Sequence, residues 1–226
     1  MPLSTLLLDA GGTIVFPNFR RIADEFAKDG VVVAAGALAH ADARVRLHID
    51  NPDIIRRIAT ENDETRWFRY IENLLRYCGA ADVPAAVVTR LKQYHDAQNL
   101  WEDVPADVVP ALESLRSRFR LGVVSNANGT VRAKLERLGL ARFFETVVDS
   151  HEEEVEKPDP RIFRVALRRM RVRPEEAAYL GDLYHVDVIG ARAAGLTAFL
   201  LDPLGLHTDK PCPRVASLAD LMRVSV

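Results

Sequence analysis

Three residues with side chains capable of chemistry each come directly after a short apolar run. Asp9 follows three leucines, and Ser125 and Asp182 follow similar runs later in the chain. Carboxylates gathered in one crevice repel one another, and a bound cation is the usual remedy. Oxygen ligands with no histidine or cysteine among them favour Mg²⁺ over Zn²⁺. If these runs end at one place, the residue types predict a magnesium site there.

The elements that must position these residues are strands that alternate with helices. Short buried strands are predicted at the apolar runs 6–8, 121–124, 146–148, 178–180 and 197–201. One helix between them begins at Asp159-Pro160, with an acid at the N-cap and proline at the first helical position, and another runs from Asp187 to Gly195. This alternation indicates an α/β fold with a doubly wound, Rossmann-like parallel sheet. Ligands bind such sheets outside the carboxyl ends of the strands, where Asp9, Ser125 and Asp182 are expected.

Residues 16–100 differ from the rest of the chain, because they show helical periodicity and no convincing strand. Apolar residues recur at helical spacing, as at Leu38 and Val45. We therefore predict an all-helical insert of three to five helices. The expected organisation is an α/β core domain formed by residues 1–15 and 101–226, with a helical cap domain at residues 16–100.

The composition excludes several classes of protein. Of 226 residues, 30 are Lys or Arg and 32 are Asp or Glu, so the net charge of -2 argues against a general binder of nucleic acid or anionic membranes. Two cysteines cannot form a disulfide scaffold, and no apolar run approaches the roughly 20 residues of a membrane span. The first residues lack the basic region of a signal peptide. We expect a soluble, cytoplasmic protein, and its oligomeric state stays open.

Four short motifs in a fixed order resemble those of the haloacid dehalogenase-like (HAD) hydrolase superfamily. They are Asp9 to Thr13 after an apolar strand, Ser125-Asn126 after a second strand, Lys157 before Pro158, and Gly181-Asp182 followed by Asp187. Each motif alone is weakly specific, but all four in order, with the expected strands before them, are a strong signal. The insert is similar to the helical cap of the subgroup (C1, subfamily IA) that includes dehalogenases, phosphoglycolate phosphatases and phosphonatases.

The resemblance implies a role for each of these residues. Asp9 would be the nucleophile that forms an aspartyl-phosphate. Mg²⁺ would be held by the Asp9 side chain, the Gly11 carbonyl and Asp182, and it would offset repulsion between the nucleophile and an anionic phosphate. Ser125 and Lys157 would hold the oxygens of the phosphoryl group.

The remaining motif residues are given supporting roles. Asp187 would orient a metal-bound water or the lysine, and Asn126 and the amides of Gly12 and Thr13 would add hydrogen bonds to phosphate. The resemblance thus implies a Mg²⁺-dependent phosphatase of a small phosphorylated metabolite. The candidate residues are, for catalysis, Asp9, Ser125, Asn126 and Lys157; for phosphate, Gly12, Thr13, Ser125, Asn126 and Lys157; and for the metal, Asp9, Gly11, Asp182 and Asp187.

Gly11 departs from the pattern of the family. The phosphatases carry a second aspartate at this position, which protonates the leaving group and then activates water. General acid–base catalysis is typically worth ~10²–10⁴-fold in rate. Our hypothesis is that Gly11 limits turnover, favours substrates whose leaving group needs little protonation, or requires an acid from elsewhere.

Other functions of the family are weighed against the same residues. A catalytically weak or inactive protein that binds a ligand or partner is one alternative, and a haloacid dehalogenase-type hydrolase is another. Dehalogenases carry an aromatic residue at the Gly11 position and do not need the Gly181-Asp182 pair that this chain has. Phosphonatases need a cap lysine for a Schiff base, and the insert has only Lys28 and Lys92, neither at the expected place.

Overall fold

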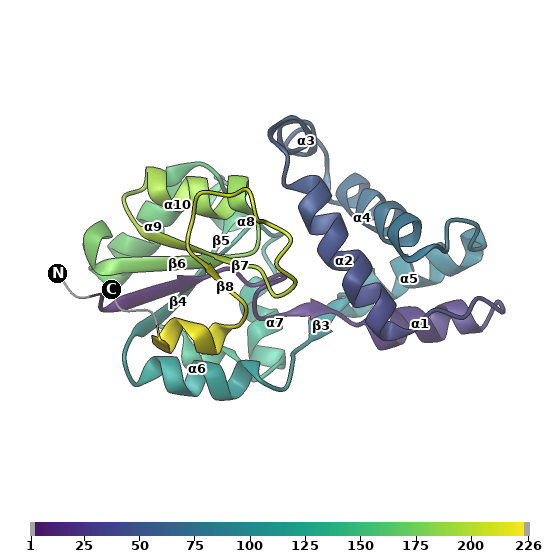
Figure 1. The fold of residues 1–226 in the computed structure, drawn as a ribbon, viewed down its shortest axis with the longest axis horizontal. Coiled ribbons are helices and arrows are strands. Elements are labelled where there is room, and N and C mark those ends of the chain that lie inside the picture. The colour runs from purple at the N-terminus through teal and green to yellow at the C-terminus, as the bar shows by residue number, and fades with distance from the viewer. Residues whose placement is uncertain (1–2, 224–226) are drawn as a thin grey trace. The chain divides into compact units, whose positions relative to one another are not determined.

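The computed structural model, which describes residues 3–223, contains a six-stranded parallel sheet (Figure 1). The strand order is β5-β4-β1-β6-β7-β8, so β1 lies between strands that come far later in the chain. The strands are β1 Thr5–Leu8, β4 Arg120–Ser125, β5 Thr146–Asp149, β6 Ala177–Gly181, β7 Thr197–Leu201 and β8 Arg214–Val215. The predicted doubly wound α/β fold is confirmed.

The register of the sheet brings the ends of its central strands together. Leu8 of β1 pairs with Val123 of β4 and with Leu180 of β6. Because the strands are parallel, the residues that follow each of these positions meet at one edge of the sheet. The strands are buried on both faces, which is why they appear in the sequence as short continuous apolar runs.

Helices cover both faces of this sheet. α9 and α10 lie over one face and α6 over the other (Figure 1). Asp159 caps α9 by accepting a hydrogen bond from the Arg161 amide at 2.8 Å, and Pro160 is the first helical residue, as predicted. The helices of this part are α6 Val108–Arg116, α7 Val131–Arg137, α8 Ser150–Glu153, α9 Pro160–Met170 and α10 Ile189–Ala193.

The helix expected from Asp187 begins earlier and differently. A π-helical turn spans Tyr184–Val188 and leads directly into α10. Asp187 lies inside this turn, where its carboxylate accepts a hydrogen bond from the Leu183 amide at 2.9 Å. The acid therefore satisfies a backbone donor at the start of the helix from within its first turn, and not from the N-cap position.

Residues 17–103 form a second compact unit, and residues 1–16 with 104–226 form the first. Five helices build the second unit, within the predicted three to five: α1 Phe19–Ala27, α2 Ala35–Ile49, α3 Pro52–Ile58, α4 Asp63–Cys78 and α5 Ala85–Gln98. Their apolar faces share a core that includes Leu38, Ile71 and Leu91. Two short paired strands, β2 Phe16–Pro17 and β3 Trp101–Asp103, stand where the chain passes between the units. That these units are a hydrolase core domain and a cap domain stays a prediction.

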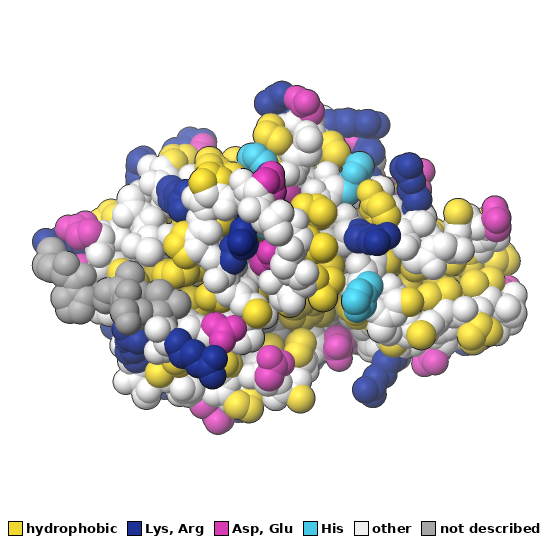
Figure 2. All heavy atoms as spheres, viewed as in Figure 1, with side chains coloured by type: hydrophobic (Ala, Val, Ile, Leu, Met, Phe, Trp, Pro, Cys, Tyr) yellow, Lys and Arg dark blue, Asp and Glu magenta, His cyan; other side chains and the backbone are white. Residues whose placement is uncertain are grey.

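Charged side chains of both signs are interspersed on the face of the molecule shown in Figure 2. No large basic area stands out there, which agrees with the net charge of -2. Among residues 3–223, no helix has the length and apolar character that crossing a membrane requires.

Candidate active site

Three carboxylates meet at the carboxyl edge of the sheet. Asp9 follows β1, Asp182 follows β6, and Asp187 lies in the π-helical turn. Each offers an oxygen within 4.8 Å of the others, and the three residues are only 7%, 5% and 1% exposed. Buried carboxylates at this spacing repel strongly unless a cation lies among them.

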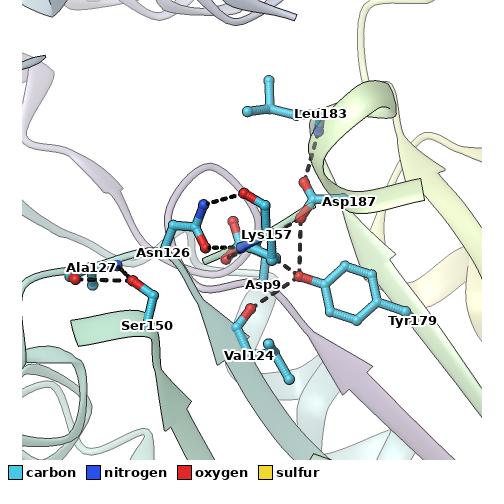
Figure 3. A network of polar contacts seen from close by, with 9 residues as sticks. All are labelled: Asp9, Val124, Asn126, Ala127, Ser150, Lys157, Tyr179, Leu183 and Asp187. Carbon is cyan, nitrogen blue, oxygen red and sulfur yellow. Dashed lines mark hydrogen bonds and ion pairs between the residues drawn. The ribbon is translucent and has the colours of Figure 1, made fainter. Parts of the chain in front are cut away.

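Lys157 supplies one positive charge to this cluster. Its Nζ atom lies 2.8 Å from Asp9 Oδ1 and 2.7 Å from Asp187 Oδ1, and it donates to the Tyr179 hydroxyl at 2.9 Å (Figure 3). Two of its three N–H bonds are donated to Asp187 and Tyr179, and its contact with Asp9 is an ion pair. The lysine is 4% exposed and is therefore held in place by its partners and not by solvent.

The electrostatics of the cluster favour a charged lysine. Burial alone disfavours an ammonium, but the Asp187 and Asp9 carboxylates outweigh it and raise the pKa of Lys157. Burial raises the pKa of Asp9, and Asp187 adds to this against the lowering by Lys157. One lysine thus does not fully compensate the buried acids, and a further cation would favour the ionised form of Asp9.

Asn126 fixes the backbone of the lysine. Its Nδ2 donates to the Lys157 carbonyl at 2.9 Å, and its Oδ1 accepts from the Lys157 amide at 2.7 Å (Figure 3). This two-bond clamp joins the end of β4 to a loop 31 residues later. The side chain expected to contact phosphate thus has a positioning task, and its contact with phosphate stays a prediction.

The other residues predicted to bind phosphate lie at the end of β4 and in the loop after β1. Ser125 is the last residue of β4 and is 5% exposed. The Gly12 amide donates to the Val15 carbonyl at 2.9 Å, and the Thr13 amide donates to the Ala10 carbonyl at 3.4 Å. These two amides close the loop after β1, so their expected hydrogen bonds to phosphate stay predictions. Gly12 has a φ of 80°, which explains why glycine stands there.

Gly181 is required by the closeness of the acidic cluster. A Cβ atom at this position would lie 2.3 Å from the carboxyl carbon of Asp187. Only glycine lets β6 end directly against this side chain, so the glycine before Asp182 is a packing requirement of the site.

The sequence analysis missed two buried polar residues, of which Tyr179 belongs to the site and Asp149 does not. Tyr179 lies inside an apolar run and appeared to be an ordinary core residue. Asp149 directly follows the run at 146–148, the same signal that identified Asp9, and it is 1% exposed. Its carboxylate accepts from the Val131 amide at 3.2 Å and the His151 amide at 3.0 Å, so it caps two helices rather than facing the acids.

The donor set fits a hard divalent cation. All candidate ligand atoms at the cluster are oxygens, and they are buried close together. The two oxygens of Asp187 already accept from Lys157, Tyr179 and the Leu183 amide. These contacts favour a supporting role for Asp187 over direct ligation of a cation. Oxygen ligands of this kind suit Mg²⁺.

Comparison with known proteins identifies the class. The family model of haloacid dehalogenase-like hydrolases matches residues 3–195, and the chain belongs to this family of hydrolases. It is similar to a glyceraldehyde 3-phosphate phosphatase of Methanopyrus kandleri, with 32% identity over 197 residues, 86% of this chain and 82% of the relative. A phosphoserine phosphatase of Thermus thermophilus is 43% identical over 100 residues, which are 44% of this chain and 40% of that enzyme.

A solved structure shares the fold over nearly the whole chain. A HAD phosphatase from Thermococcus onnurineus superposes with a TM-score of 0.61 at 23% identity, covering 98% of this chain and 97% of its own. At this identity the likeness establishes the fold and says nothing of the substrate.

Proposed function

We propose that this hydrolase is a Mg²⁺-dependent phosphatase of small phosphorylated metabolites, with Asp9 as its nucleophile. The observation that carries the proposal is the buried cluster in which Asp9, Asp182 and Asp187 lie within 4.8 Å and Lys157 touches two of them. A cluster with uncompensated negative charge suits a divalent cation and an anionic substrate bound together.

The reaction would proceed in two displacements. An oxygen of the Asp9 carboxylate attacks phosphorus, the bond from phosphorus to the leaving oxygen breaks, and the leaving oxygen takes a proton from solvent, since position 11 has no acid. Water then attacks the same phosphorus and gives up a proton to solvent, the bond to Asp9 breaks, and inorganic phosphate leaves with the carboxylate restored. Splitting one displacement in this way divides a difficult step into two easier ones.

Each neighbouring residue has a task in this scheme. Lys157 and the Ser125 hydroxyl would hold the phosphoryl oxygens, where charge spreads in the transition state. Asp182 would join Asp9 and the Gly11 carbonyl in holding Mg²⁺. When bound, the metal neutralises charge between the nucleophile and the phosphate. Asp187 would keep the lysine directed at the reacting group.

The relatives support a small phosphorylated metabolite as the substrate. They include enzymes named for glyceraldehyde 3-phosphate, phosphoserine and ribulose 1,5-bisphosphate. The shared element of these compounds is a phosphate monoester on a short polar carbon skeleton. We propose the same substrate class here, together with the helical-cap subgroup that the sequence motifs and the five-helix unit indicate.

Hydrolysis of p-nitrophenyl phosphate with Mg²⁺ tests the proposal, alongside a panel of glyceraldehyde 3-phosphate, phosphoserine and sugar phosphates. We expect activity that EDTA removes and Mg²⁺ restores. Asp9→Asn should lower it at least about 10³-fold, because the amide is a poor nucleophile. Asp53→Asn is the matched control, since that aspartate is exposed on α3. Absence of activity toward every compound in folded wild-type protein would overturn the proposal.

Gly11 bears on the rate of this reaction. With no carboxyl at position 11, a leaving group that needs a proton should depart slowly, whereas p-nitrophenolate leaves without one. We propose that turnover on alkyl phosphates is limited by this missing acid. If the missing acid lowers turnover far enough, the protein would be weakly active or would bind its ligand without hydrolysing it.

The variant Gly11→Asp tests the role of the missing acid. We expect kcat on an alkyl phosphate to rise about 10-fold to 100-fold, and kcat on p-nitrophenyl phosphate to change less than about threefold. Gly11→Asn is the control, because it adds similar bulk without a transferable proton. Equal effects on both substrates would contradict this account of Gly11.

A further inference from the structure

We propose that Tyr179 is a positioning residue whose hydroxyl orients Lys157 for phosphoryl transfer. This inference rests on the proposed function, because it assigns a task within the same reaction. Neither the family motifs nor the expected catalytic set contains this tyrosine.

The position of the hydroxyl is tightly fixed. The Tyr179 ring is fully buried and packs edge-on against Phe163, with ring centroids 5.0 Å apart. Its oxygen lies 2.9 Å from Lys157 Nζ, 3.0 Å from the Val124 carbonyl and 3.1 Å from Asp187 Oδ1 (Figure 3). A buried ring of this kind has little rotational freedom, so the hydroxyl oxygen keeps one position next to Lys157 and Asp187.

A hydroxyl is suited to this place because it can both accept and donate a hydrogen bond. Lys157 donates one N–H to the tyrosine oxygen, and the tyrosine hydrogen can then be donated to the Val124 carbonyl or to Asp187. The hydroxyl thereby accepts from an ammonium without adding charge to a cluster already rich in carboxylates. A side chain without the oxygen would leave a buried N–H of the lysine unpaired.

Fixing two N–H bonds of the lysine sets the direction of the third. Tyr179 and Asp187 accept two of them, and the ammonium nitrogen lies 2.8 Å from Asp9 Oδ1, with which it forms an ion pair. Asp9 is the proposed site of attack on phosphorus, so the ammonium lies beside the place where the transferring group would arrive. Without Tyr179 the ammonium would be free to swing toward Asp187.

The same hydroxyl connects two of the residues proposed to hold phosphate. Val124, which can accept its hydrogen, directly precedes Ser125 at the end of β4. Tyr179 on β6 therefore links the backbone that presents Ser125 to the side chain of Lys157. The positions of Ser125 and Lys157 relative to one another therefore depend on the Tyr179 hydroxyl.

Kinetics of Tyr179→Phe with p-nitrophenyl phosphate and Mg²⁺ test this role. The substitution keeps the ring and removes only the oxygen. We expect kcat to fall about 10-fold to 100-fold, the range for one hydrogen bond to a charged group. KM should change less than about threefold, and inhibition by orthovanadate, a transition-state mimic, should weaken by about the same factor as kcat.

Tyr70→Phe is the matched control, because it removes a tyrosine hydroxyl that is hydrogen-bonded to a buried acid, Asp42, in the second unit. It should lower Tm while kcat stays within about twofold of the wild type. Should Tyr179→Phe fail to fold, Tyr179→His and Tyr179→Met make the same comparison, since an imidazole nitrogen can accept from the lysine and methionine accepts only weakly. We then expect the histidine variant to have at least about five times the kcat of the methionine variant.

The outcomes separate the two proposals. Wild-type kcat and orthovanadate inhibition in Tyr179→Phe, or equal kcat in the histidine and methionine variants, would overturn the positioning role alone. A folded wild-type protein that hydrolyses no phosphate ester would overturn the proposed function, and the positioning role with it.

Discussion

The two compact units each bury an acid beside a cation and a tyrosine, and the two arrangements differ in one respect. In the second unit, Asp42 accepts from the Tyr70 hydroxyl at 2.8 Å with one oxygen and pairs with Arg46 at 2.9 Å with the other. One acid there meets one cation, and both oxygens have a partner. Burial raises the pKa of Asp42, and Arg46 partly offsets it.

The sheet edge combines the same residue types in a different proportion. Three carboxylates approach one another there, and Lys157 is in contact with two of them. The charges of the Asp42–Arg46 pair balance without a bound ion. The cluster at the sheet edge has surplus negative charge, which a bound cation would balance. The comparison teaches that the balance of charge, and not burial or residue type, distinguishes a site for chemistry from a structural network.

Removing the cation of the sheet edge should have the largest effect. Lys157→Met leaves two buried carboxylates without their ion pair, and we expect a loss of about 3–5 kcal/mol in the free energy of unfolding. It also removes a group proposed to hold the phosphoryl oxygens, so kcat should fall about 10²–10³-fold. Urea unfolding and steady-state kinetics measure the two effects. Lys28→Met, at an exposed lysine directly after α1, is the control. Unchanged kcat in Lys157→Met would contradict the proposed difference in role between the sheet edge and the Asp42 network.

Breaking the balanced pair should affect stability alone. Asp42→Asn leaves Arg46 without its counter-charge, and we expect about 3 kcal/mol less free energy of unfolding. Below the melting temperature, kcat should stay within about twofold of the wild type. Asp53→Asn, an exposed acid on the neighbouring α3, should change neither quantity. A large fall in kcat of folded Asp42→Asn would show that this network also serves the reaction.

The smallest effect concerns Lys134 on α7, a mostly buried lysine that contrasts with Lys157. Burial, with a further contribution from Arg137, lowers the pKa of Lys134 to about 8, and Asp149 and Asp9 offset this only in part. Between about pH 8 and the usual lysine value near 10.5, the unfolded chain binds more protons than the folded one, so this group adds stability as pH rises.

Lys134→Met should therefore be more stable than the wild type at pH 7, by about 1 kcal/mol after allowance for the partial exposure of the side chain. The gain should shrink as pH rises and disappear near pH 10.5. Urea unfolding at pH 7, 8.5 and 10 measures it, with Lys28→Met as the reference. A difference that stays constant with pH would contradict the assigned cause.

Much of the fold and the acidic cluster could be predicted from the sequence, because both depend on local signals. Short apolar runs mark strands that are buried on both faces, and an acid directly after such a run marks the edge where ligands bind. The Asp159-Pro160 pair fixed the start of α9 for the same reason, since capping involves neighbours in the chain.

The parts that could not be predicted depend on partners far away in the sequence. Tyr179 resembles a core residue until its hydroxyl meets Lys157, 22 residues earlier, and Asn126 gives no sign that it will hold a backbone 31 residues later. Asp42 lies on the buried face of α2 between Leu38 and Val45, and the sequence does not show that Tyr70, 28 residues later, will donate a hydrogen bond to it there. The spacing of residues likewise does not reveal the π-helical turn at Asp187 or the hydrogen bond that the Asp187 side chain accepts from the Leu183 amide.

The strand order has a consequence for how the protein is made. β1, which ends directly before Asp9, is synthesised before the other strands, yet its two neighbours in the sheet are residues 120–123 and 177–180. During synthesis the edges of this strand stay without their partners until most of the chain has left the ribosome. The pairings are also of high sequence separation, which slows folding. The acidic cluster therefore forms only after Asp182 and Asp187, its last members in the sequence, have left the ribosome.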